Sequence, residues 1–172
     1  MPPPADFPRG ATRGVPLLLI ALAVLLLAAR ITLALVERGG PTPDGKGLVV
    51  WQSIADGEAI AKTTGKPILY DFTAEWCSPC KRLEAEVFAD RGTAGMIESN
   101  YVPIRVTDRQ REEGRNPPDI AALQARYQVQ AFPTLVVVRV DGSVATRIEG
   151  FTGKSAVVSQ LMQASIPAPL PH

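Results

Sequence analysis

Histidine and cysteine are almost absent from this sequence, and their scarcity excludes several kinds of site. The single histidine, His172, is the last residue, so a catalytic dyad or triad that needs a histidine inside the fold is excluded. The two cysteines, Cys77 and Cys80, are too few for a disulfide-stapled scaffold and cannot supply four zinc ligands within one chain. We therefore expect no metal site.

The sequence also lacks an excess of charge of either sign. Lysine and arginine number 18 and aspartate and glutamate 17, which leaves a formal net charge of +1. Such a chain has no field that attracts a polyanion, so we expect no nucleic-acid partner. Hydrophobic residues at 46% and charged residues at 20% are ordinary values for a globular protein. The 172 residues suit one domain with a short appendage.

The longest apolar run occupies residues 15–36 and contains one charge, Arg30. At roughly 1.5 Å per residue, a helix of this length spans a hydrocarbon core of about 30 Å, and Arg30 can snorkel to the interface. The alternative is a cleaved secretory signal, in which Arg9 and Arg13 form the charged N-terminal region, residues 15–29 form the apolar core and cleavage falls near residues 28–29. We favour an uncleaved transmembrane anchor because the apolar run resumes after Arg30. Both interpretations export the segment that follows.

Composition divides the chain into five parts. Gly/Pro-rich residues follow the apolar run, and Pro-rich residues end the chain, as is typical of linkers and tails. We expect an N-terminal tail at 1–14, a transmembrane anchor or uncleaved signal at 15–36, a linker at 37–47, a folded domain at 48–165 and a tail at 166–172.

The apolar pattern within the folded domain predicts alternating strands and helices. We expect strands at 48–51, 67–73, 101–106, 134–140 and 143–149, and helices at 53–64, 77–88, 93–99, 119–127 and 155–164. The Asp141-Gly142 pair between the last two strands is typical of a type I′ hairpin. The charged segment 108–118 is expected to be a solvated loop, with a partner-docking surface as the alternative. This order predicts an α/β fold with a mixed sheet and helices on both faces.

Cys77-Ser78-Pro79-Cys80 stands where a predicted strand ends and a predicted helix begins. Unpaired backbone N–H groups and the helix dipole favour a thiolate there, so Cys77 is the expected nucleophile. Cys80 lies one turn further on, where it can attack a mixed disulfide formed at Cys77. The pair would exchange two electrons without a metal or cofactor. Lys81 excludes a haem-attachment motif, which needs histidine at that position. A purely structural disulfide between the two cysteines is the remaining alternative.

Two segments of the sequence resemble the thioredoxin superfamily. Residues 70–81 (YDFTAEWCSPCK) resemble the active-site segment of thioredoxins, and residues 131–134 (AFPT) resemble their cis-proline loop. Residues 81–84 (KRLE) and 87–90 (VFAD) are similar to the C-terminal periplasmic domain of the disulfide reductase DsbD. The resemblance covers residues 48–163 and implies a thioredoxin-like fold with a central mixed β-sheet flanked by helices. In this chain a single N-terminal transmembrane helix would precede that fold.

The resemblance also implies roles for individual residues. Cys77 and Cys80 match the catalytic pair, and Asp71 matches the buried acid that relays a proton to or from Cys80. Pro133 matches the cis-proline that leaves neighbouring backbone groups free for substrate. Further substrate-binding positions are implied for Trp76, Ser78, Pro79 and Phe132. Each role has an alternative. Asp71 could make only a local hydrogen bond, Pro133 could follow a trans peptide bond, and Trp76 could be a partly exposed packing residue.

These observations together predict a membrane-anchored thiol-disulfide oxidoreductase that acts as a reductase. Oxidised exported proteins are its expected substrates. A membrane thiol electron donor is its second expected partner, because the sequence holds no further cysteines to re-reduce the pair. We expect a monomer in the cytoplasmic (inner) membrane, with the catalytic domain facing the periplasm or outside. An oxidase or isomerase, a cytoplasm-facing reductase and a membrane-tethered binding module are the alternatives.

Overall fold

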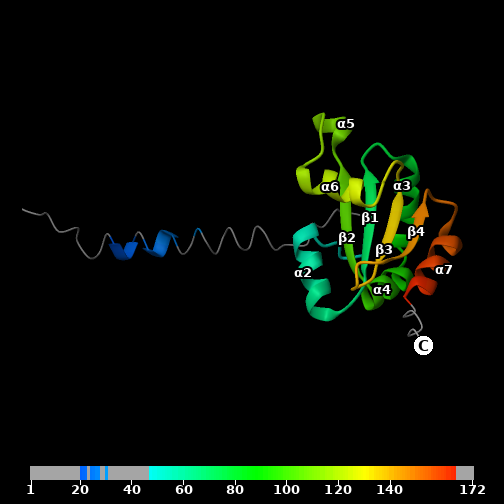
Figure 1. The fold of residues 1–172 in the computed structure, drawn as a ribbon, viewed down its shortest axis with the longest axis horizontal. Coiled ribbons are helices and arrows are strands. Elements are labelled where there is room, and N and C mark those ends of the chain that lie inside the picture. The colour runs from blue at the N-terminus through cyan, green and yellow to red at the C-terminus, as the bar shows by residue number, and fades with distance from the viewer. Residues whose placement is uncertain (1–19, 23, 28–29, 31–46, 166–172) are drawn as a thin grey trace, which may run out of the picture. The chain divides into compact units, whose positions relative to one another are not determined.

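The chain divides into two compact units, residues 1–40 and 41–172. The structure, a computed structural model, describes residues 20–22, 24–27, 30 and 47–165 (Figure 1). The described residues of the first unit are helical and expose apolar side chains. Within the described ranges, no helix is both long enough and apolar enough to cross a membrane.

Several predicted segments fall outside the described residues. They are the tails at 1–14 and 166–172, most of the predicted anchor at 15–36, and the linker at 37–47 apart from its last residue. The second unit is therefore described from Gly47 to Ser165.

A four-stranded mixed sheet forms the centre of the second unit. Its strands are β1 (Ile68–Ala74), β2 (Val102–Asp108), β3 (Thr134–Val138) and β4 (Val144–Glu149). The spatial order is β2-β1-β3-β4, with β1 parallel to β2 and antiparallel to β3, and β3 antiparallel to β4. The two central strands, β1 and β3, are buried along nearly their whole length, as their continuous apolar sequences indicate. The prediction of a mixed sheet is confirmed.

Helices cover both faces of this sheet (Figure 1). They are α2 (Ile54–Thr64), α3 (Ser78–Leu83), the π-helical turn η1 (Glu84–Phe88), α4 (Arg91–Asn100), α5 (Gln110–Glu113), α6 (Pro118–Arg126) and α7 (Lys154–Ala164). One face packs beneath α2 and α6, with a core that includes Tyr70, Phe72, Ile104, Leu123 and Tyr127. The other face packs beneath α3, η1, α4 and α7, with a core that includes Leu69, Leu83, Val87, Ile97 and Leu161.

Local sequence explains how α2 begins, ends and packs. Ser53 is its N-cap, and the Ser53 hydroxyl accepts a hydrogen bond from the backbone N–H of Asp56 at 3.2 Å. Gly65 ends the helix in the left-handed region, with φ 70°. Gly57 faces β2 so closely that a Cβ atom there would lie 2.4 Å from the Ile104 side chain. A glycine at this position therefore allows α2 to approach the sheet.

The predicted first strand at 48–51 is wrong. The segment is irregular, and its neighbour Gln52 makes one isolated bridge to Ile104 of β2. Val49 and Trp51 are buried while Leu48 and Val50 are exposed, so burial alternates as it does along a strand. This alternation produced the strand-like sequence pattern without the ladder of hydrogen bonds.

The predicted hairpin between β3 and β4 is confirmed, but its predicted type I′ turn is wrong. A type I′ turn needs positive φ at both central residues, whereas Gly142 has φ 82° and Asp141 is not in the positive region. The connection instead closes through the Gly142 N–H, which donates to the Arg139 carbonyl at 2.9 Å. The Asp141 carboxylate stabilises it by accepting from the Ser143 N–H at 2.9 Å.

One predicted helix and one predicted loop also differ from the structure. The helix expected at 77–88 passes from α3 into η1, where the Ala89 N–H donates to the Glu84 carbonyl at 2.9 Å, a span of five residues. The segment expected to be a loop at 108–118 contains the short helix α5, and α6 begins at Pro118, one residue before the helix expected at 119–127.

Candidate active site

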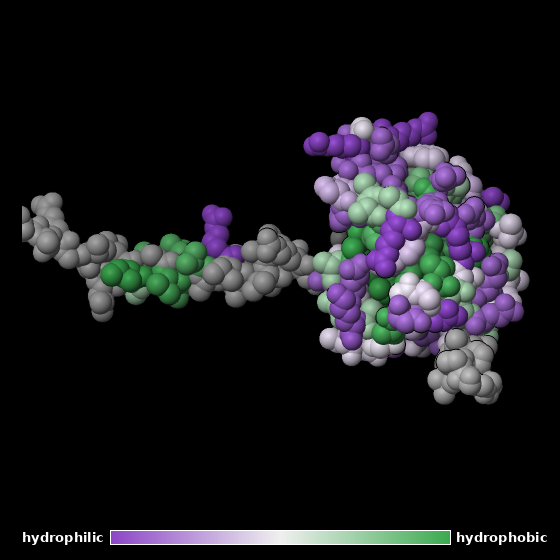
Figure 2. All heavy atoms as spheres, viewed as in Figure 1, coloured by the Kyte–Doolittle hydropathy of each residue, from purple (hydrophilic) through white to green (hydrophobic). Residues whose placement is uncertain are grey.

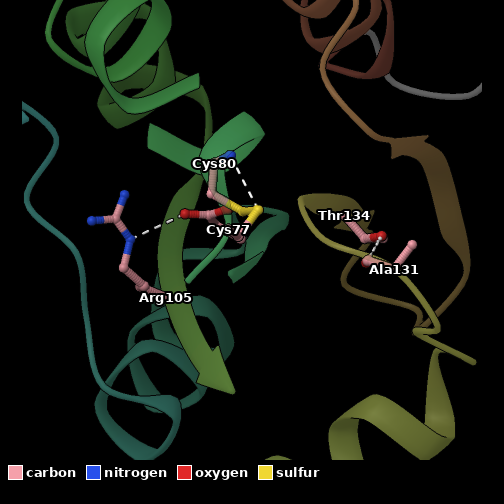
Figure 3. The surroundings of a disulfide bond; sticks show 6 residues. Cys77, Cys80, Arg105, Ala131 and Thr134 are labelled. Carbon is pink, nitrogen blue, oxygen red and sulfur yellow. Dashed lines mark hydrogen bonds and ion pairs between the residues drawn. A yellow bond between two sulfur atoms is a disulfide. The ribbon is translucent and has the colours of Figure 1, made fainter. Parts of the chain in front are cut away.

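The two cysteines form a disulfide bond at the start of α3 (Figure 3). Cys77 is the N-cap residue, and its Sγ accepts a hydrogen bond from the Cys80 backbone N–H at 3.2 Å. Pro79 stands in the first turn, where its missing N–H costs no helical hydrogen bond. The Cys77 sulfur therefore lies at the positive end of a short helix, where a thiolate is stabilised.

Asp71 lies in the middle of β1, the strand that leads to the cysteines. Its neighbours Tyr70 and Phe72 point into the core beneath α2 and α6, so Asp71 faces the side covered by α3 and η1. The residue is only 2% exposed, and its Oδ1 atom has no hydrogen-bond partner. Burial raises the pKa of Asp71 to about 6, although the Arg105 guanidinium opposes this rise and the Glu84 carboxylate adds to it. Such a carboxyl exchanges protons close to neutral pH.

Arg105 joins Asp71 to a second carboxylate. Arg105 of β2 pairs in register with Asp71 of β1, and its Nε donates to Asp71 Oδ2 at 3.0 Å (Figure 3). Its Nη2 makes an ion pair with Glu84 of η1, and its guanidinium lies 4.2 Å from the centre of the Trp51 ring. One cation thus serves two largely buried acids, with an aromatic face beside it.

The outer wall of this charge cluster is formed by Gly47 and η1. Glu84 Oε1 is buried without a hydrogen-bond partner. A Cβ atom on Gly47 would lie 2.1 Å from that oxygen, so the backbone at Gly47 closes over the carboxylate. The acids therefore lie in a low-dielectric environment, where each charge has a strong effect on its neighbours.

The peptide bond between Phe132 and Pro133 is cis, as the resemblance implied. The loop is held by the Thr134 hydroxyl, which donates to the Ala131 carbonyl at 2.8 Å (Figure 3), and by the Gly150 N–H, which donates to the Pro133 carbonyl at 2.8 Å. Phe132 packs against the small buried cluster that contains both cysteines. The cis-proline loop and the disulfide therefore belong to one site.

Trp76 lies beside Phe132 at the edge of this site. Its side chain is 46% exposed, and its ring meets the Phe132 ring edge to face with centroids 5.9 Å apart. Ser78 is exposed and Pro79 is half-buried. Because the disulfide itself is almost covered, exposed side chains around it offer the first surface that a partner protein would meet.

The structure brings most of the predicted site residues together. Phe132 contacts the cluster of Cys77 and Cys80, and Trp76 contacts Phe132. The roles of Arg105 and Glu84 were missed, although Glu84 stood in a segment that resembles DsbD. The position of Glu84 on the same helix as Cys77 and Cys80 was the feature of the sequence that could have indicated its place in the site.

Metal binding finds no support in the described residues. Across residues 47–165 and the short described stretches before them, no group of three or more His, Cys, Asp or Glu side chains converges to hold a metal ion. The chemistry that the arrangement offers is exchange between thiols and disulfides.

Comparison with known proteins agrees with this chemistry. A family model described as a thioredoxin-like domain matches residues 55–165. The chain is 30% identical over 150 residues to the thiol:disulfide interchange protein DsbD of Yersinia enterocolitica, a match that covers 83% of this chain and 25% of that protein. It is 33% identical over 99 residues to a thioredoxin of Mycobacterium tuberculosis, covering 58% of this chain and 74% of that protein. The chain thus spans about a quarter of its DsbD relative.

Solved structures show the same fold. The oxidised C-terminal domain of Neisseria meningitidis DsbD superposes with a TM-score of 0.54 and 25% identity, covering 64% of this chain and 90% of that one. A DsbH oxidoreductase superposes with a TM-score of 0.59 at 23% identity, covering 68% and 84% of the two chains. The second likeness concerns the fold alone.

Proposed function

Because the chain belongs to the thioredoxin-like family and is a thiol-disulfide oxidoreductase, we propose that it is a membrane-anchored reductase of disulfides in exported proteins. The observation that carries this proposal is the Cys77–Cys80 disulfide at the start of α3, beside the cis peptide of Pro133. Its reductive direction is supported by the likeness to DsbD, which extends over most of the chain.

The reaction transfers two electrons from the dithiol to the substrate. The Cys77 thiolate attacks one sulfur of the substrate disulfide, which forms a mixed disulfide and releases one substrate thiolate. The Cys80 thiolate then attacks the Cys77 sulfur, which closes the Cys77–Cys80 disulfide and releases the second substrate thiolate. Two protons complete the reduced substrate.

Asp71 supplies a proton acceptor near the second of these steps. Cys80 must lose its thiol proton before it attacks, and a carboxylate with a pKa of about 6 is ionised and able to accept that proton at neutral pH. Arg105 holds the carboxylate in place and limits the rise of its pKa. Asp71 is therefore proposed as the proton relay of the site.

Anchoring is supported by the N-terminal apolar segment. The described residues 20–22 and 24–27 are helical, and their side chains are exposed, with Leu25 at 68% (Figure 2). Exposed apolar side chains on a helix are those that lipid would cover. An anchor would hold the domain beside a membrane thiol donor and raise the effective concentration of each for the other.

The reduction potential tests the direction of electron transfer. The full chain, solubilised in a mild detergent, is equilibrated in glutathione buffers, and the free thiols are trapped by alkylation and counted by mass. A value near that of thioredoxin, roughly −270 mV, supports the reductase, whereas a value near roughly −120 mV indicates an oxidant. If Cys77 and Cys80 cannot be both reduced and re-oxidised in these buffers, the enzymatic proposals fail and a non-enzymatic binding module becomes the favoured alternative.

Labelling in intact cells tests the orientation in the membrane. Ser159 is exposed on α7, so Ser159→Cys in a chain with both native cysteines changed to serine carries one accessible thiol. A membrane-impermeant maleimide should label it before the cells are lysed. Labelling only after lysis would contradict the proposed periplasmic or external location and favour a cytoplasm-facing domain.

A further inference from the structure

The charged segment 108–118 lies against the active site. Figure 1 shows α5 at the same end of the domain as the connection from β1 to α3. The Arg111 guanidinium of α5 lies 5.0 Å from the centre of the Trp76 ring, and Trp76 in turn meets Phe132. A continuous row of side chains therefore runs from this segment through the exposed tryptophan to the cis-proline loop.

A partly buried polar network holds the segment in place. Asp108 at the end of β2 is 6% exposed, and its Oδ2 accepts from Asn116 Nδ2 at 2.6 Å and from Gln124 Nε2 at 2.8 Å. Asn116 also accepts from the Arg109 backbone N–H at 2.6 Å and donates to Gln124 Oε1 at 2.9 Å. Both ends of the segment are thus joined to α6, which fixes the position of Arg111 relative to Trp76.

Arg111 has hydrogen-bonding capacity to spare. Within the described part of the chain, Arg111 makes no hydrogen bond and no ion pair. The carboxylates of Glu75 and Glu113 lie within 4.0 Å of Arg109 instead, at 3.4 and 3.7 Å. A guanidinium stacked on an aromatic ring keeps its N–H groups in one plane, where two of them can bind a carboxylate at once. The exposed Trp76 face beside it would cover the apolar part of a bound peptide.

We propose that Arg111 and Trp76 form a specificity site for substrates that carry a carboxylate next to the disulfide to be reduced. This inference rests on the proposed function, because it names the substrate class of the same site. Residues 108–118 contain three arginines and three acids, so their long-range fields largely cancel. The preference therefore arises from direct contact with Arg111 and from the position of the substrate carboxylate.

The test uses two cyclic disulfide peptides that differ only in glutamate or glutamine next to the attacked cysteine. The reduced full chain is mixed with each peptide, and the reaction is quenched with acid and alkylated, so that the readout does not depend on Trp76 fluorescence. We expect Arg111→Ala to lower the ratio of the glutamate rate constant to the glutamine rate constant by about two- to fivefold, the range of a surface ion pair. Comparing ratios cancels the effect of the peptide charge on its own thiol.

Arg115→Ala is the matched control, because Arg115 is exposed on the same segment and, within the described part of the chain, makes no cation–π contact with Trp76. It should leave the ratio unchanged, and Arg111→Lys should retain part of the preference. Equal ratios in the wild type and Arg111→Ala, or equal losses in the two alanine variants, would overturn the inference while leaving the reductase intact. Failure of the wild type to reduce either peptide would instead refute the proposed function.

Discussion

Replacing Asp71 with asparagine should stabilise the oxidised protein at alkaline pH but have much less effect at acid pH. The carboxyl is fully enclosed, and burial raises its pKa from 3.8 to about 6 against the opposing effect of Arg105. Asparagine has nearly the same shape and cannot ionise. Arg105 keeps its ion pair with Glu84 in this variant, so no cation is left unpaired.

The sign and size follow from proton linkage. Below pH 3.8 the carboxyl is protonated in both the folded and the unfolded chain, and there is no penalty. As the pH rises from 3.8 to 6, the unfolded chain loses its proton first, so the free energy of unfolding falls and levels off above the folded-state pKa. At about 1.4 kcal/mol for each pH unit, the penalty at pH 8 relative to pH 4 is about 2 to 3 kcal/mol. Asp71→Asn lacks this penalty.

Urea denaturation of the oxidised wild type and Asp71→Asn at pH 4 and pH 8 measures this difference. The gain in unfolding free energy from the substitution should be larger at pH 8 by that amount. Asp119→Asn, on the exposed first turn of α6, is the matched control and should show a much smaller change with pH. A gain that stays constant between the two pH values, or that is larger at pH 4, would refute the reasoning that burial controls this carboxyl.

Three further predictions concern the same site. Arg105→Met removes the cation shared by two buried acids and should cost about 3 to 5 kcal/mol of unfolding free energy at pH 8; a loss under about 1 kcal/mol in urea denaturation would contradict the shared pairing. Cys80→Ser should trap a substrate in a mixed disulfide with Cys77, visible on a non-reducing gel, whereas Cys77→Ser should trap none; the reverse result would exchange the roles of the two cysteines. Gly47→Ala brings a Cβ to 2.1 Å from Glu84 Oε1 and should cost about 1 to 3 kcal/mol, and unchanged stability would show that the carboxylate moves freely.

The sequence was sufficient to predict the features that depend on neighbouring residues. The Cys77–Cys80 spacing, the apolar run of β1 and the alternation of strands and helices led to the mixed sheet and to a disulfide at the start of a helix. A local sequence pattern gave a wrong prediction where a strand and an irregular segment show the same alternation of buried and exposed residues. Alternating burial at 48–51 imitates a strand, although the segment makes no ladder.

Features that depend on long-range pairing could not be predicted from one sequence. Arg105 meets Asp71 because β1 and β2 pair in a particular register, which no local pattern reveals. Arg111 reaches Trp76 because a polar network folds residues 108–118 back over the site. In both cases the chemically important neighbour lies more than 30 residues away in the chain.

The π-helical turn at Glu84–Phe88 has a consequence for insertions and deletions in this region. A π turn contains one residue more than the α-helical turn it replaces, and each residue of an α-helix advances the side-chain direction by about 100°. The wider turn absorbs the extra residue, so deleting one residue between Glu84 and Phe88 should restore a regular helix whose flanking segments keep their directions. Glu84 would still reach Arg105, and Val87 would still face the core. The same deletion within the regular turns of α2 would instead rotate the rest of that helix by about 100°. A homologous helix that is one residue shorter at this turn can therefore keep both the charged site and the apolar packing.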